Sequence, residues 1–112
     1  MALLIVQAAS EDTIAAPGNR KPNYVCASVT DAVGNPVTGL GVANFAVQPL
    51  VVGPGGALDT IQSVTAAGLP GMYIVSVVPI GTETWKSGTY IFGLSVTHAG
   101  DHGQALATVL MD

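Results

Sequence analysis

Charge is what this 112-residue chain lacks most. Asp, Glu, Lys and Arg make up 9% of its residues, against about 25% in ordinary soluble domains. Lys and Arg together number 3, and the net charge is -4. A chain with so few basic residues has no surface that could neutralise a phosphate backbone, so we expect no nucleic-acid partner. Hydrophobic residues make up 49%, which argues against an intrinsically disordered chain.

Cysteine and long apolar runs are also scarce. The single Cys26 excludes an intrachain disulfide. No stretch approaches the ~20 apolar residues of a membrane-spanning helix, so we expect no membrane insertion. The segment 1–7 has only a short apolar run and no basic residues, unlike a secretory signal peptide. This favours a component that is assembled in the cytoplasm. The alternative is a chain whose leader is not part of this sequence. The length predicts one domain, residues 1–112, large enough to bury about 65% of its extended surface.

The chain is rich in glycine and proline, which interrupt regular structure, and in short runs of β-branched residues. It contains 14 Gly and 7 Pro, and the short runs between them alternate apolar and polar residues, as half-buried strands do. Helix signals are nearly missing. We therefore predict an all-β protein, an antiparallel sandwich of about seven strands. The expected strands are residues 3–8, 24–30, 42–48, 57–65, 72–78, 89–97 and 104–111.

Details of these strands predict their places in the sheets. Pro49 either restricts the third strand to a sheet edge or ends the strand, because proline cannot donate to a ladder. The last two strands form a hairpin around a tight turn at 100–103. Alternation also predicts which side chains face inward. The expected core is Val25, Val29, Phe45, Val47, Tyr73, Val75, Val77, Tyr90, Phe92, Leu94 and Val96.

The segment VTDAVGNPVTG, residues 29–39, is the most informative stretch. It describes a strand that leaves its sheet through a turn. Asp31 can accept hydrogen bonds from the backbone of the turn that it opens. Gly34 can supply a positive φ. Pro36 fixes its own φ and holds the preceding residue extended.

This segment resembles the V-x-D-x-x-G-N-P-V-x-G connection of bacterial and phage immunoglobulin-like domains, the Big-like domains of invasin- and intimin-type adhesins and of virion proteins. Two later segments, GMYIVSV (71–77) and WKSGTYIFGLSV (85–96), look like the G-x-Y strands of the same class. Tyr90 would then stand at a strand start, as in a tyrosine corner. The resemblance implies an immunoglobulin-like sandwich used for structure or binding.

The turn His98-Ala-Gly-Asp101-His102 holds the main cluster of ligand-type residues. A turn can bring two imidazoles together, but a stable metal site needs three or four ligands. We interpret the cluster as polar residues of a hairpin turn. We therefore expect no metal ligands, no cofactor-binding residues and no cofactor.

Other candidate residues for chemistry are weaker. Cys26 has no basic neighbour in sequence to lower the pKa of its thiol. Asp59 and Glu83 lack apolar surroundings that would raise the pKa of one carboxyl for glycosidase chemistry. Trp85 and Tyr90 fit the core better than a sugar-stacking patch, although a carbohydrate ligand remains an alternative. We expect no catalytic residues and no enzymatic activity.

The shortage of charge points to a function. Ten charged residues have to cover about 5,700 Å² of folded surface, far fewer than monomers usually expose. We therefore expect a structural subunit of a homo-oligomeric assembly, with copies of itself and other assembly proteins as partners. The setting would be a phage virion or a bacterial cell surface. The alternative is an extracellular adhesion or carbohydrate-binding module. The residues expected at the interface are Leu3, Ile5, Met72, Ile74 and Val78.

Overall fold

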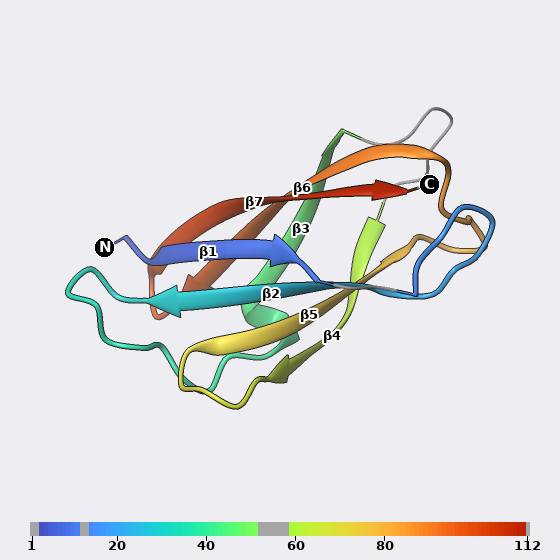
Figure 1. Ribbon diagram of the computed structural model, residues 1–112. Helices are drawn as coiled ribbons and strands as arrows, with labels where there is room; N and C mark the ends of the chain where they lie inside the picture. Colours follow the sequence, from blue (N-terminus) through green and yellow to red (C-terminus); the bar gives the residue numbers. More distant parts are fainter. Residues whose placement is uncertain (1–2, 12–13, 52–58, 112) are drawn as a thin grey trace.

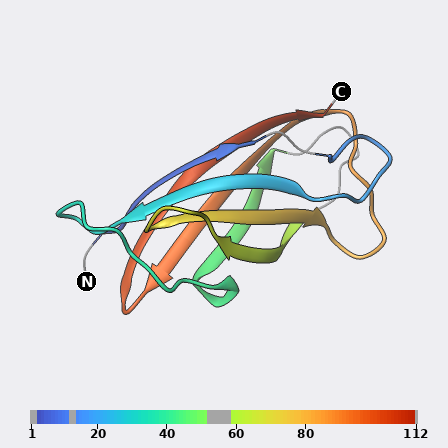
Figure 2. The same ribbon diagram turned by 60° about the horizontal axis from the view of Figure 1, so that its bottom comes forward.

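The computed structural model describes residues 3–11, 14–51 and 59–111, and it shows two antiparallel β-sheets packed face to face (Figures 1 and 2). One sheet has the strand order β1-β2-β5-β4 and the other has the order β3-β6-β7. The expected all-β sandwich is confirmed. Its strands are β1 (Ile5–Ser10), β2 (Asn23–Thr30), β3 (Phe45–Val51), β4 (Asp59–Ala66), β5 (Met72–Pro79), β6 (Gly88–His98) and β7 (Asp101–Met111).

The core lies between the sheets and is filled by the inward phase of each strand. All of the expected core residues are buried except Val47, which is only partly buried. Val47 lies on an edge strand, beside a hollow that Thr60 and Ile61 of β4 also line. Leu4, Trp85 and Met111 belong to the core as well. Within the described residues, no helix is long and apolar enough to cross a membrane.

The first strand begins later than predicted because the chain changes sheets there. Leu3 pairs in parallel with His102 of β7, and the Leu4 N–H donates to the His102 carbonyl at 2.8 Å. From Ile5 onward the chain pairs with β2 instead. β1 therefore runs beside β7 and closes this side of the sandwich (Figures 1 and 2).

The third strand also begins later than predicted. Residues Val42–Asn44 form a 3-10 turn, and β3 starts at Phe45. Asn44 holds the turn, because its side-chain oxygen accepts from the Gly41 N–H at 2.9 Å and its amide donates to the Thr97 carbonyl. β3 lies at a sheet edge, as Pro49 predicted, but it continues to Val51 through a register shift.

Two local irregularities explain the remaining differences from the prediction. The register of β4 shifts between Ile61 and Ser63, which breaks the alternation that was weakest in this run. The start predicted at residue 57 lies outside the described residues. The final hairpin turns at Ala99 and Gly100 rather than at 100–103, with φ of 52° and 86°. Positive φ at both central residues gives a type I′ turn, which matches the twist of the strands.

Candidate functional site

The turn after β2 is built as the sequence predicts. The Asp31 carboxylate accepts from the N–H groups of Asn35 and Val33 at 2.9 and 3.0 Å. These hydrogen bonds, first that from Asn35, hold the pKa of Asp31 below its ordinary value because they favour the ionised form. Gly34 has a φ of 92°. The turn is therefore organised by one side chain and one glycine.

The two segments that carry the resemblance contact each other in space. The Val29 N–H donates to the Gly71 carbonyl at 2.8 Å. A Cβ at Gly71 would lie 2.8 Å from the Val29 oxygen and 2.9 Å from the Pro36 Cβ, and its φ is 78°. Gly71 is thus required both by its backbone conformation and by its neighbours.

Tyr73 extends this contact. Its hydroxyl donates to the Val37 carbonyl at 2.6 Å and accepts from the Leu40 N–H at 3.3 Å. Its ring packs edge-on against Phe45, with centroids 5.5 Å apart. Tyr73 therefore fixes the β2–β3 connection to the core.

Trp85 organises the opposite end. Its indole N–H donates to the Lys21 carbonyl at 2.7 Å, and its ring packs perpendicular to Tyr90. The Tyr90 hydroxyl accepts from the Lys86 N–H at 2.8 Å, which is the contact of a tyrosine corner. Both aromatic residues are buried. The core interpretation of Trp85 and Tyr90 is confirmed, and a sugar-stacking patch made of them is excluded.

The His98–His102 turn does not bring its imidazoles together. His98 lies opposite Asp101 and Thr97 lies opposite His102. Successive residues of a strand point to opposite faces, so the two imidazoles project from different faces of the hairpin. In the part of the chain that the structure describes, no group of three His, Cys, Asp or Glu residues is arranged to hold a metal ion.

Cys26 lies on the outer face of the four-stranded sheet and is partly buried. Burial raises the pKa of its thiol, and the neighbouring Glu11 carboxylate acts in the same direction. The thiol is therefore protonated at neutral pH, which is the opposite of what a nucleophile needs. Glu83 is exposed, and the side chain of Asp59 lies outside the described atoms.

The predicted interface residues lie mainly on the outer face of the four-stranded sheet. Ile5 is exposed on β1, whereas Met72, Ile74 and Val78 on β5 are partly buried. Small side chains of β2, including Cys26, lie between them. A hollow of about 300 Å³, lined by Gln7, Cys26 and Met72 among others, indents this face. Leu3 is exposed at 66% but lies at the other sheet, beside His102.

The outer face of the three-stranded sheet is the more apolar one. Leu50, Leu106 and Leu110 are exposed there at 52%, 61% and 61%. We call the outward-pointing residues of β3, β6 and β7 the CFG face, after the third, sixth and seventh letters of the alphabet. Its described members include no Asp, Glu, Lys or Arg: Ala46, Gln48, Leu50, Thr89, Ile91, Gly93, Ser95, Thr97, His102, Gln104, Leu106, Thr108 and Leu110.

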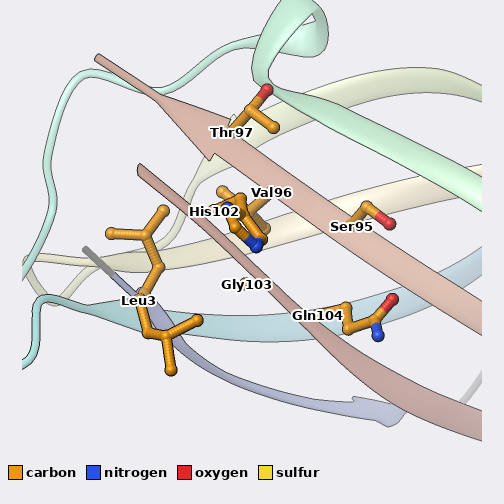
Figure 3. A pocket seen from close by; sticks show the side chains of 8 residues that line it. Leu3, Ser95, Val96, Thr97, His102, Gly103 and Gln104 are labelled. Atoms are coloured by element: carbon orange, nitrogen blue, oxygen red, sulfur yellow. The ribbon is translucent and has the colours of Figure 1, made fainter. Parts of the chain in front are cut away.

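Two hollows indent the CFG face. The larger, about 550 Å³, is lined by Ser95 and Thr97 of β6, His102 and Gln104 of β7, and Leu3 (Figure 3). The second, about 400 Å³, lies over Gly93 between Leu50 and Leu106. Ser95 and Gln104 line both, so the hollows form one trough with a polar centre and apolar ends.

Sequence reasoning missed the leucines of this face. Residues 104–111 are apolar on both phases, and the larger side chains would ordinarily be placed inside. The structure places Ala107 and Met111 inward and Leu106 and Leu110 outward. The cause is β1, which runs so close to β7 that a Cβ at Gly103 would meet the Leu4 carbonyl. The sequence did hold one signal of this arrangement: Gly103, Ala105 and Ala107 alternate along β7, and such small side chains indicate the side that packs against another segment.

Comparisons of the chain with models of known protein families, with curated proteins and with solved structures find no match.

Proposed function

We propose that this protein is a non-enzymatic structural subunit that assembles with further copies of itself, built on an immunoglobulin-like sandwich. The sheet orders β1-β2-β5-β4 and β3-β6-β7 support this type, because constant-type immunoglobulin domains have the orders ABED and CFG. The hydrogen bond between Lys86 and Tyr90 supports it as well. A phage particle or a bacterial surface is the setting that the motif resemblance favours.

The CFG face is the observation that carries the assembly proposal. Three half-exposed leucines on a face whose described residues include no Asp, Glu, Lys or Arg make an apolar patch of the kind that monomers rarely expose. Across the whole molecule, ten charged residues share 5824 Å² of accessible surface. Contact with neighbouring subunits would remove this apolar surface from water, and none of the described residues of the CFG face would place an Asp, Glu, Lys or Arg side chain in that contact.

The strand edges favour assembly through faces rather than through strand addition. β1 is shielded by β7, and the Leu4 N–H is already used. β3 carries Pro49 and a register shift, and β4 carries the shift between Ile61 and Ser63. Prolines and bulges are devices by which proteins prevent edge pairing. The edge of β1 that faces away from β2 is thus largely covered by β7.

A carbohydrate-binding module receives less support. Phe45, Tyr73, Trp85, Tyr90 and Phe92 are all buried. Tyr24, the remaining aromatic residue, is half-buried on the four-stranded sheet. Sugar recognition by stacking needs an exposed aromatic face, so this alternative ranks below assembly.

Analytical ultracentrifugation of the unmodified protein tests the proposal. We expect sedimentation to show species larger than the 11.2 kDa monomer at micromolar concentration. Reducing agent is included, so that a disulfide between Cys26 residues cannot produce the effect. A clean monomer at high micromolar concentration would contradict the proposal and would make an isolated binding module the better reading.

A further inference from the structure

Gly93 is a glycine that the protomer itself does not need. It lies in the interior of β6, the central strand of its sheet, and its φ is not in the left-handed region. A Cβ built there meets only ordinary contacts, the nearest being a methyl of Leu50 at 3.5 Å. By contrast, Gly71 and Gly103 are each crowded by backbone of the same chain.

A glycine in a strand interior weakens the strand, and it often marks a place where another group approaches closely. Apart from its chain neighbours, no atom of the described residues lies closer than 3.5 Å to a Cβ at Gly93, so a group that needs this glycine would belong to another molecule. Gly93 forms the floor of the hollow of about 400 Å³, which opens to solvent on the CFG face. Leu106 lies directly opposite Gly93 in the β6–β7 pairing and is 61% exposed. A hollow and a protruding side chain are thus neighbours on one face.

We propose that two copies of this chain pair through their CFG faces, with Leu106 of each copy seated over Gly93 of the other. A two-fold axis parallel to the strands and midway between β6 and β7 exchanges these two positions. Each protrusion then meets a hollow, as a self-complementary interface requires. This inference rests on the proposed self-assembly and specifies the face that mediates it.

The size and charge of the face fit a second copy. β6 and β7 have 11 residues each. Across this axis β6 of each copy overlaps β7 of the other, and β3 lies outside the overlap. At about 3.4 Å per residue and 4.8 Å per strand, the overlap measures about 37 by 10 Å, or about 360 Å² of each copy. Two such areas make about 700 Å², which is the size of a weak, reversible contact, so we expect the pairing to depend on protein concentration. Because the described face carries no Asp, Glu, Lys or Arg, stacking two copies brings no ionised like charges together.

Gly93→Val tests the interface without disturbing the fold of the monomer. A β-branched residue suits a central strand, and the half-exposed Leu50 can move aside. We expect the melting temperature of the monomer to be unchanged or raised by about 2–6 °C, while self-association is lost. Leu106→Lys is expected to weaken association at least about 100-fold, because symmetry repeats the charge on both sides. Leu69→Lys, at an equally exposed leucine in a turn, is the matched control.

Sedimentation equilibrium of the four proteins decides the matter. Association of the unmodified protein and of Leu69→Lys, with loss in both CFG-face variants, supports the pairing. Association that survives both Gly93→Val and Leu106→Lys overturns the pairing but leaves self-assembly standing. A monomeric unmodified protein overturns both. Thermal melts of each variant show that loss of association is not loss of folding.

Discussion

At the scale of single residues, a few side chains and glycines fix the connections between strands. Asp31 closes the turn after β2, and Tyr73 holds the chain that follows it. Gly71 allows both segments to meet. The motif around residues 29–39 and the G-x-Y motif around Gly71 are therefore two halves of one contact.

Gly71→Ala is predicted to be strongly destabilising. The added Cβ would lie 2.8 Å from a backbone oxygen, and the φ of 78° disfavours any L side chain. Because both effects act together, we expect a loss of more than about 1 kcal/mol in the free energy of unfolding. Chemical denaturation measures it. Gly68→Ala, where a Cβ meets nothing within 4 Å, serves as the control and should change stability little.

Asp31 makes the stability of the fold depend on pH. Its native pKa is below the unfolded value, so its contribution is fully present above the unfolded pKa near 3.9 and is lost as pH falls through the native pKa. Asn in its place keeps an accepting oxygen but no charge. We expect Asp31→Asn to be less stable than the unmodified protein at neutral pH, and the difference to shrink below about pH 4. A difference in unfolding free energy that stays constant from pH 7 to about pH 2 would refute this account.

At the scale of elements, the alternation of apolar and polar residues predicts a strand well where the strand pairs with one neighbour on each side. It predicts a strand poorly where a third segment also packs against that strand. β2, β5 and β6 lie near their expected bounds, and their inward phases are buried. The sheet change at Leu3–Leu4 depends on His102, nearly one hundred residues away in sequence. The outward leucines of β7 depend on β1 in the same way. Contacts between segments so far apart in sequence produce no periodic pattern in the residues around them, so alternation alone does not predict them.

In the β6–β7 hairpin, one residue type does not suit the backbone conformation of the turn, and a substitution can correct this. Ala99 occupies a left-handed conformation with φ of 52°. Such a conformation costs an ordinary L residue about 1 kcal/mol or more, whereas Asn followed by Gly is the preferred pair of a type I′ turn. We expect Ala99→Asn to raise the free energy of unfolding by about 0.5–1 kcal/mol. A thermal melt that shows destabilisation would mean that the turn is not of this type.

The same hairpin is predicted to have no role as a metal site. Because His98 and His102 project from opposite faces, changing both to Ala should leave the fold intact. Elemental analysis should find no metal that is present in the unmodified protein and absent from the double variant. His102 lines the trough of the CFG face, so a modest effect on association is compatible with this prediction, and a lost metal is not.

At the scale of the whole molecule, the two outer faces differ in what they can offer to a neighbour. Hollows indent both faces. The CFG face carries three exposed leucines, whereas Ile5 is the large exposed apolar residue described on the outer face of the four-stranded sheet. An extended assembly needs at least two contact surfaces for each subunit, because one self-complementary face closes a dimer. The interface predicted from the sequence at Ile5, Met72, Ile74 and Val78 is the candidate for the second contact.

Ile5→Lys is therefore predicted to limit assembly without dissolving a CFG-face dimer. A lysine there places a charge in the second contact, where it would be desolvated without a partner. Light scattering should show smaller species than those of the unmodified protein, with the dimer retained. Lys21→Arg, a conservative change at an exposed position in the β1–β2 connection, should change nothing. Unaltered large species in Ile5→Lys would remove this face from the assembly.

The parallel contact between Leu3–Leu4 and β7 has a mechanical consequence. The molecule is 41 Å long, and β1 begins toward one pole while β7 ends toward the other (Figure 1). Tension applied to the start of β1 and the end of β7 pulls the two strands along each other, so it loads the contacts between them in shear. The time such a unit survives under load depends on its unfolding rate rather than on its equilibrium stability. In the assembly that we propose, a subunit with this geometry would transmit force along its long axis.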